Sequence, residues 1–281
     1  MDELIIESYG KINLALDILY KRNDDYHEIK SVMQEIDLKD KLIFKDLKEG
    51  IIIESNNPKV PNNSGNLVYK AWKKLQEISG VKKGLYVYIE KNIPIGGGLG
   101  GGSSNGAATL QALNKLWDLK LSSGELMDIG RELGADIPFC IMGGTALAEG
   151  IGEKLTSLKA FSGKYILLCN PGIEISTPEV YKKIKPNGQR LDIEGLIKAI
   201  ENEDTRQVGK KLANKLEAVV IEDYPIIGQI KETMKENGAL GSLMSGSGAT
   251  VFSLYEDKEK MEKAYEILKE SFDKVYMTKT V

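Results

Sequence analysis

The segment Pro94-Ile95-Gly96-Gly97-Gly98-Leu99-Gly100-Gly101-Gly102-Ser103-Ser104-Asn105-Gly106-Ala107-Ala108 determines how the rest of the chain is interpreted. Its glycines are unsuited to the interior of a helix or strand, because glycine loses the most backbone freedom on folding and has no side chain to pack. A strand pattern, 85–89, precedes the segment, and either Ser103 or Ser104 is expected to cap a helix that follows it. The stripe that predicts this buried helix comprises Ala107, Leu110, Leu113, Leu116 and Trp117.

A glycine loop between a strand and a helix suits a chain of phosphates, because free N–H groups and the helix dipole both attract anions. Gly96, Gly98 and Gly101 match the pattern G-x-G-x-x-G, but Asp118, the acidic residue that a dinucleotide fold needs, stands at a helix end. No Gly-Lys-Ser/Thr follows the glycines, as a P-loop requires. A flexible surface linker is the remaining alternative, and the Pro94 entry and the amphipathic exit argue against it.

Length and composition are those of an ordinary folded protein with one large or two modest domains. The 281 residues are 42% hydrophobic and 28% charged, with a net charge of −3 that does not favour a nucleic-acid surface. Cys140 and Cys169 lie in apolar runs without metal-ligand spacing, so we expect reduced thiols and a cytoplasmic protein. No apolar stretch has the length of a membrane span, and the acidic N-terminus is unlike a signal peptide.

Periodicity predicts a first domain over residues 1–158. In the strand 12–18 apolar residues alternate with polar or small ones, so Lys11 and Asn13 point the same way, onto what the pattern alone suggests is a solvated face. Asn66 is expected to cap a helix with a stripe from Val68 to Ile78, and Ser122 and Glu125 form a capping box for a helix that ends at Gly134. The other expected strands are 31–37, 41–46 and 51–55, which we expect to be antiparallel because their links are short, and 145–149.

The pattern restarts around residues 159–163 and predicts a second domain over 159–281. This domain is expected to be an α+β layer, with helices over a sheet. Its expected strands are 165–170, 250–255 and 274–278, and its expected helices are 178–184, 191–202, 205–212, 225–236 and 258–271.

Six short motifs, in this order, resemble the GHMP small-molecule kinase superfamily, which includes galactokinase, homoserine kinase and mevalonate kinase. They are most similar to the members that act on 4-diphosphocytidyl-2-C-methyl-D-erythritol (CDP-methylerythritol) in the non-mevalonate isoprenoid pathway. The resemblance covers nearly the whole chain. It implies an α+β, two-domain fold with an N-terminal ribosomal-protein-S5-like domain and a C-terminal ferredoxin-like α/β-plait domain. The motifs are Gly10–Leu14, Asp25–Glu28, the glycine loop, Gly134–Phe139, Glu149–Glu153 and Ser245–Gly248.

The resemblance implies that ATP phosphorylates the 2-hydroxyl of CDP-methylerythritol, with Mg²⁺ expected. Phosphoryl transfer to a hydroxyl depends on positioning, on charge neutralisation and on one group that accepts the proton. The family's base corresponds to Asp136, and its assisting lysine corresponds to Lys11, whose charge would hold the carboxylate ionised. On structural grounds alone, Asp136 is instead an N-cap of a short helical turn. The sequence shows no carboxylate cage for the metal, so its ligands stay open.

The resemblance also assigns residues that bind the acceptor. Tyr26 and His27 correspond to the pair that binds the cytosine base, and Tyr181 corresponds to an aromatic residue on the other side of the ring. For Tyr181, a half-buried helix tyrosine is the alternative. Asn13 would orient Lys11 and Asp136 or the substrate hydroxyl, and Thr177 belongs to the segment just before Tyr181.

On the ATP side, Asn66 and Lys91 match family positions near the adenine. A solvated strand end is the alternative for Lys91. Either serine after the glycines could reach phosphate or Mg²⁺. The residues that would wrap the phosphates are Pro94, Ile95, Gly96, Gly97, Gly98, Leu99, Gly100, Gly101, Gly102, Ser103 and Ser104.

Two positions depart from the family's pattern. Gly10 stands where alanine is frequent, and Asp25 stands where glycine usually precedes the Tyr-His pair, although aspartate tolerates a left-handed turn. Two other functions stay open. A homoserine or mevalonate type of kinase would have no use for the aromatic cluster, and an inactive nucleotide-binding regulator would need neither Lys11 nor Asp136. The expected partners are the two small-molecule substrates, without nucleic acid or membrane, for a monomer or homodimer.

Overall fold

A computed structural model describes residues 3–186 and 188–281. The chain forms two compact units, each assembled from several segments. One comprises Met1–Gly10, Leu38–Ile95 and Gly100–Gly143, and the other comprises Lys11–Asp37, Gly96–Leu99 and Gly144–Val281. Two long strands, β1 (Leu4–Lys21) and β2 (His27–Leu47), contribute residues to both units.

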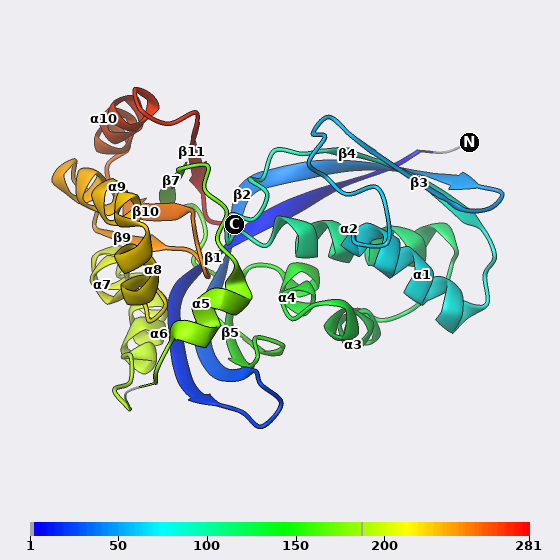
Figure 1. Cartoon of the computed structure of the whole chain (residues 1–281), viewed down its shortest axis with the longest axis horizontal. Coiled ribbons are helices and arrows are strands. Elements are labelled where there is room, and N and C mark those ends of the chain that lie inside the picture. Colours follow the sequence, from blue (N-terminus) through cyan, green and yellow to red (C-terminus); the bar gives the residue numbers. More distant parts are fainter. Residues whose placement is uncertain (1–2, 187) are drawn as a thin grey trace. The chain divides into compact units, whose positions relative to one another are not determined.

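The first unit places four helices on one face of a small sheet. Strand β4 (Gly84–Glu90) pairs antiparallel with Lys41–Leu47 of β2 and parallel with β3 (Ile51–Ser55). Figure 1 shows α1 and α2 side by side along these strands. Sheet residues such as Phe44 and Val87 share one hydrophobic core with helix residues such as Leu75 and Leu110. The helices are α1 (Leu67–Ser79), α2 (Gly101–Leu116), α3 (Ser123–Leu133) and α4 (Ile137–Met142).

The second unit contains an antiparallel four-stranded sheet in the order β11-β7-β10-β9. Helices α9 and α10 contact this sheet, and residues such as Leu167 and Met234 share its core. The strands are β7 (Tyr165–Asn170), β9 (Gly241–Met244), β10 (Val251–Tyr255) and β11 (Lys274–Lys279). The helices are α5 (Thr177–Lys183), α6 (Ile193–Glu201), α7 (Thr205–Lys211), α8 (Glu217–Asp223), α9 (Pro225–Glu236) and α10 (Lys258–Lys269).

Three short strands complete the second unit. Strand β5 (Thr145–Gly150) pairs antiparallel with Ile29–Gln34 of β2 and with β6 (Lys154–Ser157). Strand β8 (Ala213–Asn214) pairs parallel with Ala15 and Leu16 of β1. None of the helices in the described ranges has the length and apolar character needed to cross a bilayer.

Local signals predicted the starts of two helices correctly, α1 and α3. Asn66 caps α1 by accepting a hydrogen bond from the Val68 N–H, and Ser122 and Glu125 form the expected capping box of α3. The stripe of α1 is buried except for Ile78, which is exposed. Helix α3 ends at Leu133 as expected, but Gly134 is extended there and makes no left-handed cap.

Other expectations were wrong. Residues 31–37 and 41–46 belong to one continuous strand, β2. Strand β3 pairs parallel with β4, because α1 lies between them in the chain and provides the crossover that a parallel pair needs. Helix α2 begins at Gly101 and has Gly100 at its N-cap, so neither Ser103 nor Ser104 caps it. Helix α8 and strands β6, β8 and β9 had no clear sequence signal.

Candidate active site

The glycine loop requires glycine for two separate physical reasons. Gly96, Gly98 and Gly100 have φ values of 66°, 75° and 69°, in the left-handed region that strains other residues. At Gly98 a Cβ atom would also lie only 2.1 Å from the Ser245 carbonyl oxygen, so no side chain fits there. The run of glycines therefore reflects both the backbone path and a close approach of two chain segments.

The tip of the loop is fixed by residues of the second unit. The Ser245 hydroxyl donates to the Gly98 carbonyl at 2.9 Å, and the Thr250 N–H donates to the Gly97 carbonyl at 3.2 Å. The Lys11 N–H donates to the Leu99 carbonyl at 2.9 Å. Three successive loop carbonyls are thus held by the protein, and the motif Ser245–Gly248 lies against the tip of the glycine loop.

The two serines after the glycines differ in their surroundings. Ser104 is 4% exposed, and its oxygen accepts a hydrogen bond from the Ser8 hydroxyl at 2.6 Å. Ser103, in the first turn of α2, is partly exposed. The helix N-terminus therefore carries one hydroxyl that is tied into the interior and one that is nearer the surface.

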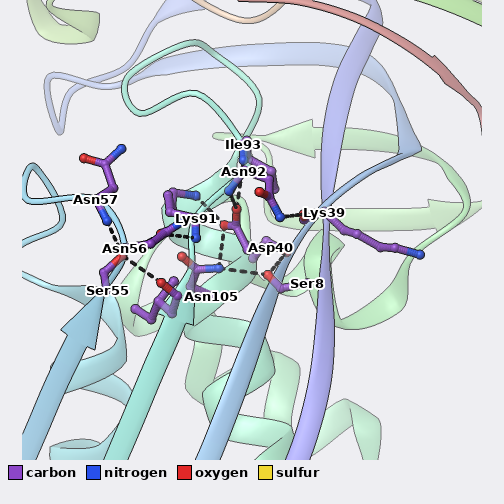
Figure 2. A network of polar contacts seen from close by, with 12 residues as sticks. Ser8, Lys39, Asp40, Ser55, Asn56, Asn57, Lys91, Asn92, Ile93 and Asn105 are labelled. Atoms are coloured by element: carbon purple, nitrogen blue, oxygen red, sulfur yellow. Dashed lines mark hydrogen bonds and ion pairs between the residues drawn. The ribbon is translucent and has the colours of Figure 1, made fainter.

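Lys91 lies in a buried polar network that the sequence did not reveal (Figure 2). Its ammonium forms an ion pair with Asp40, and the two side chains are only 5% and 0% exposed. Burial lowers the pKa of Lys91, and the negative charge of Asp40 opposes this lowering. The alternative of a solvated strand end is therefore wrong. Asp40 was missed because a lone aspartate between two expected strands has no recognisable pattern.

The Asn66 side chain forms two hydrogen bonds within the first unit. Its Oδ1 accepts from the Val68 N–H at 2.9 Å, and its Nδ2 donates to the Pro61 carbonyl at 2.6 Å. The residue is 8% exposed. These bonds fix the entry into α1.

Lys11 and Asn13 lie on one face of β1, as expected, but that face is buried. The two residues are 5% and 2% exposed, because β1 is covered on both sides from Lys11 to Ile18. Lys11 Nζ donates to Asn13 Oδ1 at 2.8 Å, and Asn13 Nδ2 donates to the Ser31 hydroxyl at 2.9 Å. The interpretation of a solvated face is wrong, and Ser31 is a partner that the sequence did not indicate.

Asp136 occupies the N-cap position of α4, as expected, but its side chain forms no capping hydrogen bond. It is half-buried. The capping interpretation of its side chain is therefore wrong. Asp136 belongs to the first unit and Lys11 to the second. The pairing of Lys11 with Asp136 stays a prediction.

Aromatic side chains meet within the second unit. The rings of His27 and Tyr181 have centroids 5.4 Å apart and planes tilted by 41°. Burial lowers the pKa of His27, and the positive charge of Lys21 lowers it further. Tyr181 is half-buried on α5 and packs against the core, so the structural alternative for it stays open.

Two other residues expected on the acceptor side, Tyr26 and Thr177, are exposed. Tyr26 is 60% exposed, and its N–H donates to Asp24 Oδ1 at 3.2 Å. Asp25 adopts the left-handed conformation expected of it, with a φ of 66°. The hydroxyls of Thr177 and Ser247 are 2.7 Å apart, which links α5 to the motif that contacts the glycine loop.

Metal-binding clusters are absent from the described ranges, where no group of three His, Cys, Asp or Glu side chains could hold an ion.

Comparisons with known proteins agree with this arrangement. Residues 66–144 match the family model described as GHMP kinases N terminal domain, and residues 196–274 match GHMP kinases C terminal. The chain is 45% identical to "4-diphosphocytidyl-2-C-methyl-D-erythritol kinase" of Clostridium novyi, over 99% of this chain and all of that protein. It is 44% identical to the protein of the same name from Caldicellulosiruptor bescii, over 98% of this chain and 97% of that protein.

Solved structures extend the comparison to the fold. A crystal structure of 4-(cytidine 5'-diphospho)-2C-methyl-D-erythritol kinase matches with a TM-score of 0.85 and 30% identity, and covers 99% of both chains. L. major mevalonate kinase matches with a TM-score of 0.78 over 100% of this chain and 96% of that chain, and its 18% identity shows the fold alone. The chain belongs to the GHMP kinase family, has its two-domain α+β fold, and groups there with the 4-diphosphocytidyl-2-C-methyl-D-erythritol kinases.

Proposed function

We propose that this enzyme transfers the γ-phosphoryl group of ATP to the 2-hydroxyl of CDP-methylerythritol, in the non-mevalonate pathway of isoprenoid biosynthesis. The observation that carries this proposal is the 42–45% identity, along essentially the whole chain, to relatives that are named for that substrate. The adjoining rings of His27 and Tyr181 support it, because a cytosine base can stack on an aromatic face.

ATP binds along the glycine loop and the N-terminus of α2. Backbone N–H groups and the helix dipole there favour phosphate oxygens. Of the two serines, Ser103 is the better candidate for a phosphate or Mg²⁺ contact, because the Ser104 oxygen already accepts from Ser8. Asn66 and Lys91 lie on the adenine side. Mg²⁺, held largely by the phosphates, would neutralise their charge.

Asp136 acts as the general base and Lys11 as its electrostatic partner. The carboxylate takes the proton from the 2-hydroxyl while that oxygen bonds to the γ-phosphorus, the bond from the γ-phosphorus to the bridging oxygen breaks, and ADP leaves. One feature supports the role of Lys11: it is an ammonium buried beside Asn13, which holds it in one orientation.

The acceptor is held by residues of the second unit. Tyr26, His27 and Tyr181 recognise the cytosine, while Asn13 and Thr177 contact the rest of the substrate. In domain terms, we assign 1–158 as the nucleotide-binding and catalytic domain, which also contributes Asn13, Tyr26 and His27 to the acceptor site, and 159–281 as the substrate-binding domain. Cys140 and Cys169 carry reduced thiols and not a disulfide, which supports a cytoplasmic enzyme. It would act as a monomer or homodimer without nucleic acid or membrane partners.

A kinase panel tests the proposal. ADP release is measured with CDP-methylerythritol, homoserine or mevalonate as acceptor, with Asp136→Asn as the matched inactive control. We expect turnover with CDP-methylerythritol alone. Turnover with homoserine or mevalonate instead would refute CDP-methylerythritol as the substrate. If none of the three acceptors stimulates ADP release, the alternative of a nucleotide-binding regulator is favoured.

A further inference from the structure

Asp40 is a buried carboxylate that collects four hydrogen bonds from two separate chain segments (Figure 2). Its Oδ1 accepts from the backbone N–H groups of Asn92 and Ile93, both at 2.8 Å. Its Oδ2 accepts from Lys91 Nζ and from Asn105 Nδ2, the latter at 2.9 Å. The carboxylate is fully saturated, with two donors on each oxygen.

These donors stand on either side of the glycine loop in the sequence. Residues 91–93 lead into Pro94, and Asn105 lies in the first turns of α2, directly after the loop. Asp40 comes where the β2–β4 ladder stops, since the last registered pair is Lys41 with Glu90. Beyond that pair, the Asp40 side chain accepts the Asn92 and Ile93 N–H groups in place of a neighbouring strand. The Asn56 side chain accepts the Lys91 N–H at 2.7 Å.

We propose that Asp40 is a positioning residue for ATP binding, because its one carboxylate ties together the entry and the exit of the glycine loop. The distance between the loop ends determines where the loop N–H groups and the N-terminus of α2 point. A looser clamp therefore weakens their alignment with the phosphates. Asp40 itself touches no substrate, since its side chain is 0% exposed.

The negative charge of Asp40 also balances the positive charge of Lys91. The Lys91 ammonium lies against Gly101 at the start of α2, where a Cβ atom would come within 2.7 Å of Nζ. A cation is unfavourable at a helix N-terminus, and a buried one needs a counter-charge. Asp40 supplies that counter-charge and keeps Lys91 folded inward beside the loop.

Asp40→Asn tests the inference, which rests on the proposed use of ATP. An asparagine keeps one oxygen for the Asn92 and Ile93 N–H groups but turns an NH₂ group toward the Lys91 ammonium and the Asn105 amide. We expect the affinity for Mg·ADP, measured by calorimetry, to fall at least about tenfold, as befits lost bonds to a charged group. We also expect faster hydrogen exchange at the Asn92 and Ile93 amides, because a neutral amide oxygen accepts more weakly than a carboxylate. The KM for the acceptor should stay within about twofold of the wild-type value. The acceptor is bound by other residues, and changes at distant sites act independently.

Leu75→Ala provides the matched control, because this fully buried residue of α1 belongs to the hydrophobic core of the first unit and takes no part in the Asp40 hydrogen bonds. It should lower the melting temperature and leave nucleotide affinity within about twofold. Unchanged nucleotide affinity in Asp40→Asn would overturn the inference, as would an equal loss of affinity in Leu75→Ala or an equal loss for the acceptor.

Asn105→Ala decides the matter if Asp40→Asn does not fold. It removes the Asn105 bonds to Asp40 and to the Ser8 hydroxyl and leaves the ion pair between Asp40 and Lys91 intact. Nucleotide affinity should then fall about threefold or more, and unchanged affinity would overturn the inference. Because ADP binding needs no acceptor, failure of the proposed substrate in the kinase panel would leave this result interpretable.

Discussion

Replacing Gly98 with alanine should disable the loop far more than replacing Gly96. Both residues have left-handed φ values, 75° and 66°, so each substitution costs about 1–2 kcal/mol of backbone strain. At Gly96 no atom lies within 4 Å of the added Cβ, whereas at Gly98 the Ser245 carbonyl oxygen would lie 2.1 Å from it. Relieving that overlap requires the two backbones to separate by about 1.3 Å, because ordinary contacts begin near 3.4 Å.

This separation also breaks the hydrogen bond from the Ser245 hydroxyl to the Gly98 carbonyl, which is 2.9 Å long. A bond of this kind contributes about 1 kcal/mol. Gly98→Ala should therefore raise the KM for ATP at least about fivefold above the value for Gly96→Ala, because about 1 kcal/mol corresponds to a factor of about five. Steady-state kinetics and thermal melts of both variants provide the assay. Equal KM values for ATP in the two variants would refute the reasoning that the Ser245 contact shapes the loop.

Three further predictions concern catalysis and the acceptor. Asp136→Asn should fold with a wild-type melting curve and lose at least about 10²-fold in kcat, as expected for removal of a general base, and near-normal turnover would contradict that role. Tyr181→Ala should raise the KM for CDP-methylerythritol but not for ATP, and an unchanged acceptor KM would leave Tyr181 as a packing residue. His27 is the one histidine of the chain, and burial lowers its pKa from the ordinary value of 6.5, which favours the neutral ring. The acceptor KM should be flat above pH 6.5 and rise only below it. The contribution of His27 to the free energy of unfolding should likewise be complete above pH 6.5 and decline as the pH falls through its lowered pKa. A profile that His27→Gln leaves unchanged would contradict this prediction.

Features that depend on neighbouring residues were predictable from the sequence. The Asn66 cap, the Ser122–Glu125 capping box and the glycine loop between β4 and α2 all arise from residues within a few positions of one another. Asp25 adopts the left-handed turn for the same local reason. The resemblance of the motifs to the GHMP kinases, confirmed by the comparisons, supplied the family and the type of reaction.

Other features depend on which distant segments meet, and only the tertiary structure decided them. The burial of Lys11 and Asn13 follows from the cover on both faces of β1, which the alternation along one strand cannot reveal. Asp40 meets Asn105 from 65 positions away, and Ser245 meets Gly98 from 147 positions away. The physical reason is that a periodic pattern reports which side of an element avoids water. The partner that covers this side, and the polar groups that must be satisfied there, are set by the packing of the whole chain.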